Sequence, residues 1–398
     1  MGGELKSAIF PTYARYPMTM VKGEGSRLWD DQGKEYLDFI SGLAVTGLGH
    51  APQAVKEKLI AQLDQLWHVS NLFSIPNQEV LAQLLTKHSC ADAVFFCNSG
   101  AEANEAAIKI ARRYHQKVLG ENRYEIITFQ QSFHGRTLAT LTATGQDKVK
   151  EGYQPLPAGF VYAPYNNAEL LEGYITEQTC AIMLELVIAE GGVIPAESDF
   201  VQEIVRLCEK HHLLLIVDEI QTGMGRTGKL FAYEHYGIEP DIITLAKALG
   251  SGFPIGAMMG KAKLVDAFTA GSHGSTFGGT PIATAAAMAT LEVIIEQRLP
   301  ERAAEMGTYA LAKISEKLND HPLIKEVRGK GLLIGIECIQ PVGDIIANIH
   351  KVGLLVVSAG PNVIRLLPNL LVTEEEVDQA IDILCTVLAQ YHAEAALN

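Results

Sequence analysis

Two short apolar runs, each ending at a charged residue, constrain this chain more than any other feature. The run at 213–217 reads LLLIV, and Asp218 follows it directly. A continuous aliphatic run of this length is typical of a strand buried on both faces of a parallel sheet. The run DIITLA at 241–246 leads to Lys247 in the same way. We therefore predict an α/β sheet with Asp218 and Lys247 at the carboxyl ends of its strands, where such sheets bind ligands.

A carboxylate and an amine at one rim of a sheet suggest a cofactor that needs both groups. Pyridoxal phosphate is such a cofactor, because its aldehyde takes a lysine as a Schiff base and an acid keeps its ring nitrogen protonated. Two ordinary interpretations stay open at this point. Asp218 could cap the turn after its strand, and Lys247 could be a solvated helix residue.

A glycine-rich stretch in the same region offers a competing phosphate site. The residues from Gly223 to Lys229, GMGRTGK, contain the dinucleotide pattern G-x-G-x-x-G and match a Walker A motif up to its last position. The Walker motif requires Ser or Thr after the lysine, but Leu230 stands there. A dinucleotide motif opens directly from its strand, whereas residues 218–222 intervene here. Nucleotide binding is therefore a remote alternative.

The composition disfavours several classes of partner. The 398 residues carry 32 Lys plus Arg against 46 Asp plus Glu, a formal net charge of −14. This acidic balance disfavours nucleic acid and anionic membrane surfaces, and an anionic substrate would need a locally cationic pocket. No apolar run is long enough to predict a spanning helix, and no targeting signal is readable at the N-terminus. Six scattered cysteines without metal-ligand spacing predict reduced thiols in a cytoplasmic protein without a metal site.

A turn of small residues leads into a helix in the first half of the chain. The strand expected at 93–97 is followed by Asn98, Ser99, Gly100 and Ala101, and then by an alanine-rich helix. The acids of this helix come early and its arginines late, as the helix dipole favours. Free N–H groups at such a helix start can bind phosphate. An ordinary N-cap by Asn98 or Ser99 is the alternative.

Further polar residues stand out in apolar surroundings. In the motif SFHGRT, Phe133 could stack on a flat ring and Arg136 could bind a carboxylate through two hydrogen bonds, although Phe133 could also be a core residue. Glu185 lies in a strand expected over 181–187, and Glu190 lies beyond it. A carboxylate in so apolar a setting needs a cationic partner.

Changes in pattern along the chain predict three parts. Residues 1–50 contain a small antiparallel meander, which we expect to join the smaller domain. Residues 51–284 are expected to form a large α/β domain. Residues 285–398 are expected to form a smaller α+β domain with three strand candidates, VRGKGLLIGIEC, VGLLVV and VIRLLP. Its final helix is predicted to begin at Thr373, with a capping box completed by Glu376.

Taken together, these segments resemble the class III pyridoxal-phosphate aminotransferases, a subgroup of the aspartate-aminotransferase-like fold, which is fold type I of the pyridoxal-phosphate enzymes. The motifs NSGAEANEAAIK, SFHGRT, VDEIQTG, LAKAL, GSTFGG, VRGKGL and IRLLP occur in the order and approximate spacing of that family over nearly the whole chain. Within the family, CNSGAEANEAAIK and SFHGRT are most similar to the acetylornithine subgroup.

The resemblance implies pyridoxal 5′-phosphate as the cofactor. Lys247 matches the Schiff-base lysine, and Asp218 matches the partner of the ring nitrogen. Gln221 would bond the phenolic oxygen, and Phe133 would stack on the ring. Thr276 would reach the phosphate held by the partner subunit, which implies a homodimer with shared active sites. The other cofactor-binding positions implied are Ser99, Gly100, Ala101, His134 and Glu219.

The resemblance also implies an amino donor and 2-oxoglutarate as substrates. Arg136 and Ser275 match substrate-binding positions, and Tyr13 is a further one. Arg365 is similar to the arginine that takes the α-carboxylate of glutamate. Glu190 is similar to the acid that holds this arginine when the other substrate is bound.

Two positions bear on how closely the chain follows the family. The motif usually reads E-P-x-Q-G-E-G-G, whereas residues 185–192 read ELVIAEGG. If the glycine replaced by Ala189 permits a conformation that alanine resists, Glu190 would be misplaced. Ornithine-specific relatives tend to carry an aromatic residue near the position of Leu43, so the leucine favours an acylated donor.

The activity implied is transfer of the ω-amino group of N-acetylornithine to 2-oxoglutarate, a step of arginine biosynthesis. The alternatives within the class are aminotransferases for ornithine, succinylornithine and 4-aminobutyrate. From other classes, a nucleotide-binding protein and a catalytically silent regulator remain.

Overall fold

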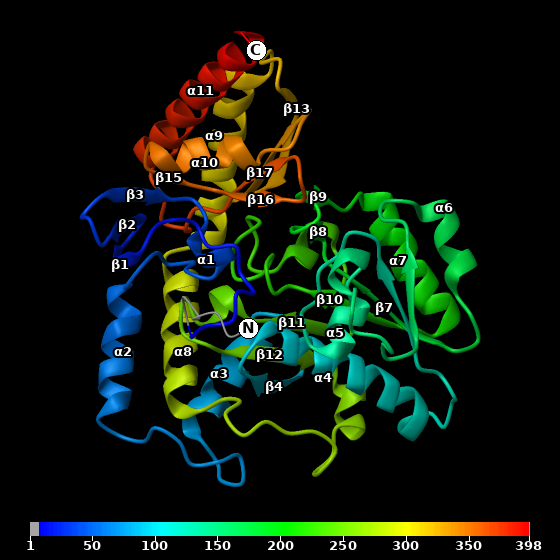
Figure 1. Cartoon of the computed structure of the whole chain (residues 1–398). Coiled ribbons are helices and arrows are strands. Elements are labelled where there is room, and N and C mark those ends of the chain that lie inside the picture. Colours follow the sequence, from blue (N-terminus) through cyan, green and yellow to red (C-terminus); the bar gives the residue numbers. More distant parts are fainter. Residues whose placement is uncertain (1–7, 398) are drawn as a thin grey trace, which may run out of the picture.

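The computed structural model describes residues 8–397. The first seven residues of the predicted N-terminal part lie outside this range. A large α/β body carries a smaller layer of helices and strands on one side, and the smaller layer contains the C-terminal helices (Figure 1). Among residues 8–397, no helix combines the length and apolar character needed to cross a bilayer.

A seven-stranded sheet forms the centre of the large body, in the order β4-β12-β11-β10-β7-β5-β6. Neighbouring strands are parallel except at β12 (Gly256–Gly260), which runs antiparallel to both β11 and β4. The prediction of a mostly parallel sheet is confirmed. The other strands are β4 (Ala93–Cys97), β5 (Glu125–Phe129), β6 (Phe160–Ala163), β7 (Thr179–Leu184), β10 (Leu214–Asp218) and β11 (Ile242–Leu245).

Burial on both faces explains the continuous apolar run of β10. Leu214 and Ile216 pack in the core cluster under the helix at 100–113, while Leu215 and Val217 pack in the larger cluster on the other face. Successive strand residues point to opposite faces, so every position of a doubly covered strand has to be apolar.

Helices cover both faces of this sheet. Helix α4 (Gly100–Arg113) contacts β10, β11 and β12, and α8 (Pro281–Glu296) packs against the two helices near the start of the chain. The predicted domain boundary at 284/285 falls inside α8. The remaining helices of this part are α1 (Ser41–Ala44), α2 (Gln53–Leu63), α3 (Pro76–Lys87), α5 (Leu138–Ala143), α6 (Ala168–Leu171) and α7 (Ser198–His211).

The C-terminal part combines three helices with an antiparallel sheet, in the order β13-β14-β17-β16. Its elements are α9 (Leu299–Leu318), β13 (Ile324–Lys330), β14 (Leu333–Cys338), α10 (Gly343–Lys351), β16 (Val357–Ala359), β17 (Val363–Leu366) and α11 (Glu374–Leu397). The segment VRGKGLLIGIEC forms two strands rather than one, because Gly331 turns the chain at a φ of +55°. The predicted capping box of α11 is confirmed, since the Thr373 N–H donates to Glu376 Oε2 and the Glu376 N–H donates to Thr373 Oγ1.

The predicted N-terminal meander is also present. Strands β1 (Met20–Glu24), β2 (Arg27–Asp30) and β3 (Glu35–Asp38) pair antiparallel. The short strand β15 (Leu354–Leu355) from the C-terminal part completes this sheet by pairing parallel to β3. The segment VGLLVV is therefore divided between two sheets, because its first half joins the meander and its second half joins β17.

A two-stranded ribbon, β8 (Val187–Ile188) with β9 (Ile194–Pro195), lies between the two parts. The predicted strand 181–187 was therefore wrong at its end, because β7 stops at Leu184 and Glu185 leaves the sheet. All six cysteines are free thiols, four of them buried, as their scattered spacing predicted.

Candidate active site

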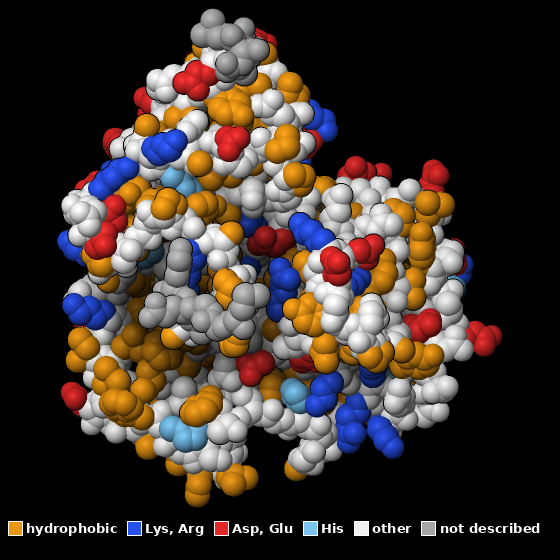
Figure 2. Space-filling view, viewed as in Figure 1, with side chains coloured by type: hydrophobic (Ala, Val, Ile, Leu, Met, Phe, Trp, Pro, Cys, Tyr) orange, Lys and Arg blue, Asp and Glu red, His pale blue; other side chains and the backbone are white. Residues whose placement is uncertain are grey.

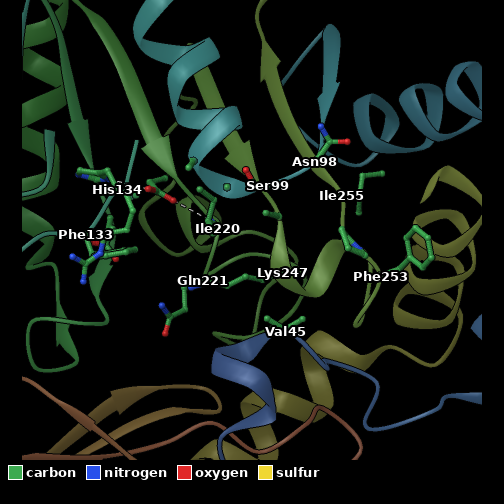
Figure 3. Close-up of a pocket in the computed structure, with 18 of the residues that line it drawn as sticks. Val45, Asn98, Ser99, Phe133, His134, Ile220, Gln221, Lys247, Phe253 and Ile255 are labelled. Carbon is green, nitrogen blue, oxygen red and sulfur yellow. Dashed lines mark hydrogen bonds and ion pairs between the residues drawn. The ribbon is translucent and has the colours of Figure 1, made fainter. Parts of the chain in front are cut away.

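A cavity of about 420 Å³ opens at the carboxyl ends of β10 and β11. This volume suits a ligand of cofactor size. The strand register pairs Asp218 with Thr244, so Lys247, three residues further, reaches the same rim. Asp218 and Lys247 both line the cavity, as their strand-end positions predicted. Figure 3 shows Lys247 near the centre, with Phe133 and His134 on one side and Phe253 and Ile255 on the other.

Lys247 is held in an environment that disfavours its charge. The residue opens a short 3₁₀ turn, Lys247–Leu249, with a φ of +46°, a conformation that is uncommon for a non-glycine residue. Burial lowers the pKa of its amine, although Glu190 works in the opposite direction. A lowered pKa raises the neutral fraction, which is the form that can attack a carbonyl or accept a proton.

Asp218 is 4% exposed and is surrounded by hydrogen-bond donors. Its Oδ2 accepts from Asn104 Nδ2 at 2.8 Å and lies 2.8 Å from His134 Nδ1, and its Oδ1 accepts from the Ile220 N–H at 3.0 Å. Donors of this kind stabilise the ionised carboxylate and fix its direction. The site can therefore offer an oriented carboxylate to a ligand.

The start of α4 borders the same cavity. Ser99 is the N-cap, since its Oγ accepts the Glu102 N–H at 3.2 Å. Gly100 and Ala101 open the helix and line the cavity. Their N–H groups belong to the first turn, where the N–H groups have no carbonyl acceptor within the helix. A Cβ at position 100 would lie 2.8 Å from Ile220 Cδ1, so glycine is needed for this close approach. The N-cap and phosphate-site interpretations of this turn are therefore compatible.

Phe133 and Arg136 stand together on another wall of the cavity. The Arg136 guanidinium lies 5.6 Å from the centroid of the Phe133 ring, and both residues line the cavity. Arg136 is exposed and forms no salt bridge within residues 8–397. A cation without an acidic partner at a cavity wall is available to a carboxylate ligand.

Arg365 is fully buried and is held by two acceptors. Its Nη1 donates to Glu190 Oε1 and to Gln221 Oε1, both at 2.9 Å. Its Nε and Nη2 have no partner among the described residues. Burial alone would raise the pKa of Glu190, but Arg365 holds it below its ordinary value. The cationic partner predicted for Glu190 is confirmed.

The departure from the family motif does not displace Glu190. Ala189 has no positive φ, so its backbone adopts a conformation that alanine accepts, and Glu190 still reaches Arg365.

Glu185 behaves differently, and the cationic partner predicted for it was wrong. Its carboxylate accepts from the N–H groups of Phe133 and Ala189, and burial raises its pKa to about 7. A carboxyl group of this kind can stay neutral without a cation.

Several predicted site residues lie outside this cavity. Glu219 turns away from it, because its carboxylate accepts from Thr222 Oγ1 and from the Tyr233 N–H, so a direct cofactor contact is a wrong assignment. Tyr13 is 77% exposed and does not line the cavity. Ser275 and Thr276 line a separate hollow of about 740 Å³. Within one chain, the structure therefore does not bring Thr276 to Lys247.

The glycine-rich segment 223–229 is not a nucleotide loop. It forms a series of turns without a helix directly after it. Arg226 is buried and donates to the carbonyl oxygens of Leu332 and Pro368. The segment thus joins the large body to the C-terminal part, and the nucleotide-binding alternative was wrong. No cluster of His, Cys, Asp or Glu suitable for a metal ion occurs within residues 8–397.

Sequence reasoning missed several residues of the site, of which Asn104 and Val45 are two. Asn104 was a detectable one, because it is an amide on an otherwise apolar face of α4 between Ala103 and Ala107. Val45 lines the cavity from an unusual turn, in which Ser41, Gly42, Leu43 and Ala44 of α1 all have φ between +48° and +68°. No sequence signal predicts a left-handed turn in which three of four residues carry side chains.

Comparisons with known proteins agree with this architecture. The family model described as Aminotransferase class-III matches residues 10–388. The acetylornithine aminotransferase of Bacillus cereus is 52% identical over 384 residues, which cover 96% of this chain and 98% of that protein. The acetylornithine aminotransferase of Bacillus subtilis is 51% identical and covers 97% and 99%.

Solved structures give the same result for the fold. The ornithine aminotransferase of Toxoplasma gondii has a TM-score of 0.93 at 32% identity, covering 97% of this chain and 93% of that one, and its active site is described as partly occupied by PLP. The N-acetylornithine aminotransferase of Stenotrophomonas maltophilia has a TM-score of 0.84 at 36% identity, covering 96% and 98%. The similarity in sequence and in fold extends over nearly the full lengths compared.

Proposed function

This chain belongs to the class III aminotransferases, and from that premise we propose that it transfers the ω-amino group of N-acetylornithine to 2-oxoglutarate. The products are N-acetylglutamate semialdehyde and glutamate, and the reaction is a step of arginine biosynthesis. The observation that carries the proposal is a half-buried lysine, Lys247, at one rim with the fixed carboxylate of Asp218. Two separate arginines accompany them: Arg136 lines the same cavity, and Arg365 donates to Gln221, which lines it too. Relatives about 50% identical that are acetylornithine aminotransferases support this choice of donor.

The residues that line the cavity fit pyridoxal 5′-phosphate, the cofactor of this family. The unsatisfied N–H groups of Gly100 and Ala101 suit its phosphate, and Asp218 suits its ring nitrogen. Phe133 offers a ring for stacking, and Lys247 offers the amine that anchors it. When bound, the cofactor supplies an electron sink for the negative charge that forms when a proton leaves the substrate carbon.

The residues of this chain supply the proton transfers and the binding. Once the donor amine has replaced it as the anchor, Lys247 Nζ would take the proton from the substrate carbon and would deliver it to C4′ of the cofactor. Its lowered pKa suits this exchange, because it increases the fraction of neutral amine that can accept a proton. Asp218 would hold the ring nitrogen of the bound cofactor in its protonated form, and its hydrogen bonds to Asn104 and to the Ile220 N–H keep the carboxylate in place.

The two arginines divide the recognition of substrate carboxylates. Arg136 has no acidic partner within residues 8–397, so it can bind a carboxylate of either substrate. Arg365 is neutralised by Glu190 while the donor is bound, because the acylated donor brings no second carboxylate. 2-Oxoglutarate brings two carboxylates, and one of them replaces Glu190 at Arg365. Nε and Nη2 of Arg365, which have no partner in the part of the chain that the structure describes, are the donors that such a carboxylate would satisfy.

Leu43 supports an acylated donor. It lies in the left-handed turn that also presents Val45 to the cavity. Its side chain offers no hydrogen-bond partner to a free α-amino group, which would be poorly satisfied beside it. Leu43 does not itself line the cavity, so its support for a donor with an acylated α-nitrogen rests on its place in the turn before Val45.

The active unit is proposed to be a cytoplasmic homodimer with shared sites. Thr276 is exposed in its own chain, away from the Lys247 cavity. Large apolar side chains near it are also exposed, including Trp67 at 61% and Phe277 at 60%. Hydrophobic side chains gather on the lower left of the molecule, over α2 and the loop after it (Figure 2). Exposed patches of this kind mark protein interfaces.

The test is a single-turnover comparison of amino donors. The holoenzyme is mixed in turn with N-acetylornithine, ornithine, succinylornithine and 4-aminobutyrate, and the absorbance near 400 nm is followed; 2-oxoglutarate is then added to restore it. We expect N-acetylornithine to react at least about tenfold faster per unit concentration than any other donor, the scale of one well-placed contact. A preference for free ornithine would overturn the proposed donor and leave the class of reaction intact.

A further inference from the structure

Residues 275–279, STFGG, form a short loop whose base is fixed and whose tip is exposed. We call it the Thr276 loop. Gly278 and Gly279 at its base are buried, while Thr276 and Phe277 at its tip are exposed. A Cβ at position 278 would lie 2.3 Å from the Phe96 carbonyl oxygen, so the base packs directly on β4. The loop therefore presents Thr276 outward from a rigid support.

Two amide side chains hold the backbone of this loop. Asn71 Nδ2 donates to the carbonyl oxygens of Ser275 and Gly278, at 3.1 Å and 2.9 Å. Gln78 Nε2 donates to the Gly279 carbonyl oxygen at 2.7 Å and also to Asn71 Oδ1 at 2.7 Å. The two side chains, here named the amide frame, bind the carbonyls on either side of the exposed tip.

The loop is also connected to the cofactor cavity of its own chain. Ser275 Oγ accepts from the Gly278 N–H at 2.9 Å and from Asn98 Nδ2 at 3.2 Å. Asn98 lines the Lys247 cavity, directly before the helix start that suits phosphate. The position of Thr276 is thus defined on both sides, by the amide frame and by the edge of the cavity.

We propose that Asn71 and Gln78 are positioning residues, which set Thr276 against the cofactor phosphate of the neighbouring subunit. This inference rests on the proposed shared site. Thr276 has a single hydroxyl to offer, and a hydrogen bond weakens steeply when its geometry is lost. The two amide groups make hydrogen bonds to three carbonyl oxygens of the loop backbone. These bonds restrict the Thr276 hydroxyl to one place, although the amides themselves are not proposed to contact the cofactor. The competing interpretation is that the amides only stabilise the fold of the subunit surface.

The test compares ligands with and without the phosphate. A charged replacement would repel phosphate directly, so the variant has to be neutral. Asn71→Leu removes the hydrogen bonds to the Ser275 and Gly278 carbonyl oxygens and keeps a similar side-chain volume. Apoenzyme dimers are titrated with pyridoxal phosphate and with pyridoxal, which lacks the phosphate. We expect the Kd of pyridoxal phosphate to rise about tenfold, the loss of roughly one hydrogen bond, while the Kd of pyridoxal changes less than about twofold.

A matched control and a double variant separate positioning from folding. Gln83→Met lies on α3, the helix that carries Gln78, but its side chain is exposed, and both Kd values should stay unchanged. Thr276→Val should reproduce the loss seen with Asn71→Leu. The double variant, Asn71→Leu with Thr276→Val, should bind pyridoxal phosphate as tightly as Thr276→Val alone, because Asn71 no longer has a hydroxyl to position.

The outcomes distinguish this inference from the shared site on which it rests. If Thr276→Val leaves the Kd of pyridoxal phosphate unchanged, the shared phosphate site itself is wrong. If Thr276→Val weakens pyridoxal phosphate and Asn71→Leu does not, the amide frame has no positioning role. Light scattering reports whether the dimer persists. If Asn71→Leu dissociates it, Gln78→Met repeats the test from the other amide, and dissociation by both variants would establish the purely structural interpretation.

Discussion

Loss of contact with water shifts the pKa values of Lys247 and Glu219 in opposite directions. Burial lowers the pKa of the Lys247 amine and raises the pKa of the Glu219 carboxyl to about 7. In each case the neutral form is favoured, because a low-dielectric interior penalises charge. Lys247 lines the cavity and can use its neutral form in chemistry, whereas Glu219 holds a turn behind it. A strongly shifted pKa therefore does not by itself identify a catalytic residue.

Lys247→Ala should abolish turnover and remove the covalent link to the cofactor while leaving noncovalent binding. The reason is that the remaining contacts of the cavity, Asp218 and the start of α4, are unchanged by this substitution. The measurement is borohydride reduction followed by mass spectrometry of the modified peptide. Lys148→Ala, at an exposed position, is the control and should keep the modified lysine. A reducible lysine adduct that persists in Lys247→Ala would rule out this anchor.

The arginine variants should differ by half-reaction. Arg136→Ala should slow both halves, and Arg365→Ala should mainly slow the half-reaction with 2-oxoglutarate, each by about 2–5 kcal/mol in transition-state binding. The division follows from the Glu190–Arg365 pair, which leaves Arg365 neutralised when only one substrate carboxylate is present. Single-turnover absorbance measures each half separately. Equal damage to both halves by Arg365→Ala would contradict the division.

Glu219 makes the stability of the protein depend on pH. Its pKa is raised from 4.5 to about 7, so between these values the folded state keeps a proton that the unfolded state has released. Stability therefore falls as the pH rises through this window. Glu219→Gln cannot ionise, and it should match the parent near pH 5 and exceed it near pH 8, by up to about 3 kcal/mol.

Urea denaturation of the apoenzyme at the two pH values measures this difference. Glu209→Gln, at an exposed position on α7, is the control, and its difference from the parent should not change with pH. A constant difference for Glu219→Gln as well would show that the carboxyl ionises in the folded state as it does in water.

At the scale of elements, predictability followed the strength of the local pattern. Strands β10 and β11 were predicted because uninterrupted apolar runs are required where both faces are covered. Strand β12, GAMMG, is short and begins and ends with glycine, so its local pattern is weak. The break after β7 was missed because Glu185 leaves the sheet only to meet the N–H groups of Phe133 and Ala189, a tertiary contact.

The residues of the site also differ in how far the local sequence pattern predicted them. Asp218 and Lys247 were predictable, because strand ends in such a sheet converge on one rim. The hydrogen bonds that orient Asp218 come from Asn104 and His134, on segments far away in sequence, and no local pattern states that they meet. Glu219 was misassigned because it neighbours Asp218, although successive residues at the end of a strand point to opposite sides.

The capping box of α11 offers a prediction at this scale. Thr373→Ala removes the hydroxyl that accepts the Glu376 N–H, so the free energy of unfolding should fall by about 1 kcal/mol. Glu376 also accepts from Ser26 Oγ at 2.8 Å, so the cap supports the N-terminal meander as well. Thr386→Ala, exposed within the same helix, is the control and should have little effect. Equal urea midpoints for the two variants would show that the cap contributes nothing.

At the scale of the whole molecule, the shared site predicts complementation between inactive chains. Lys247→Ala and Thr276→Asp are co-expressed with different affinity tags, and the mixed dimer is purified. If Thr276 acts across the interface, one site of the hybrid receives both defects and the other receives neither. Activity should therefore return to about half that of the parent, although each variant alone is nearly inactive. A hybrid as inactive as its parents would place Thr276 in its own chain's site.

The pairing of β3 with β15 links the start of the chain to a segment near its end. During synthesis, the meander formed by residues 20–38 emerges with one edge open, and residues 354–355 close it only much later. At translation rates of about 5–20 residues per second, that edge stays unpaired for roughly 15–60 s. An open strand edge can pair with other chains, so nascent protein is exposed to aggregation for that interval. Ribosome-associated chaperones thus have a defined segment to protect and a defined time in which to do so.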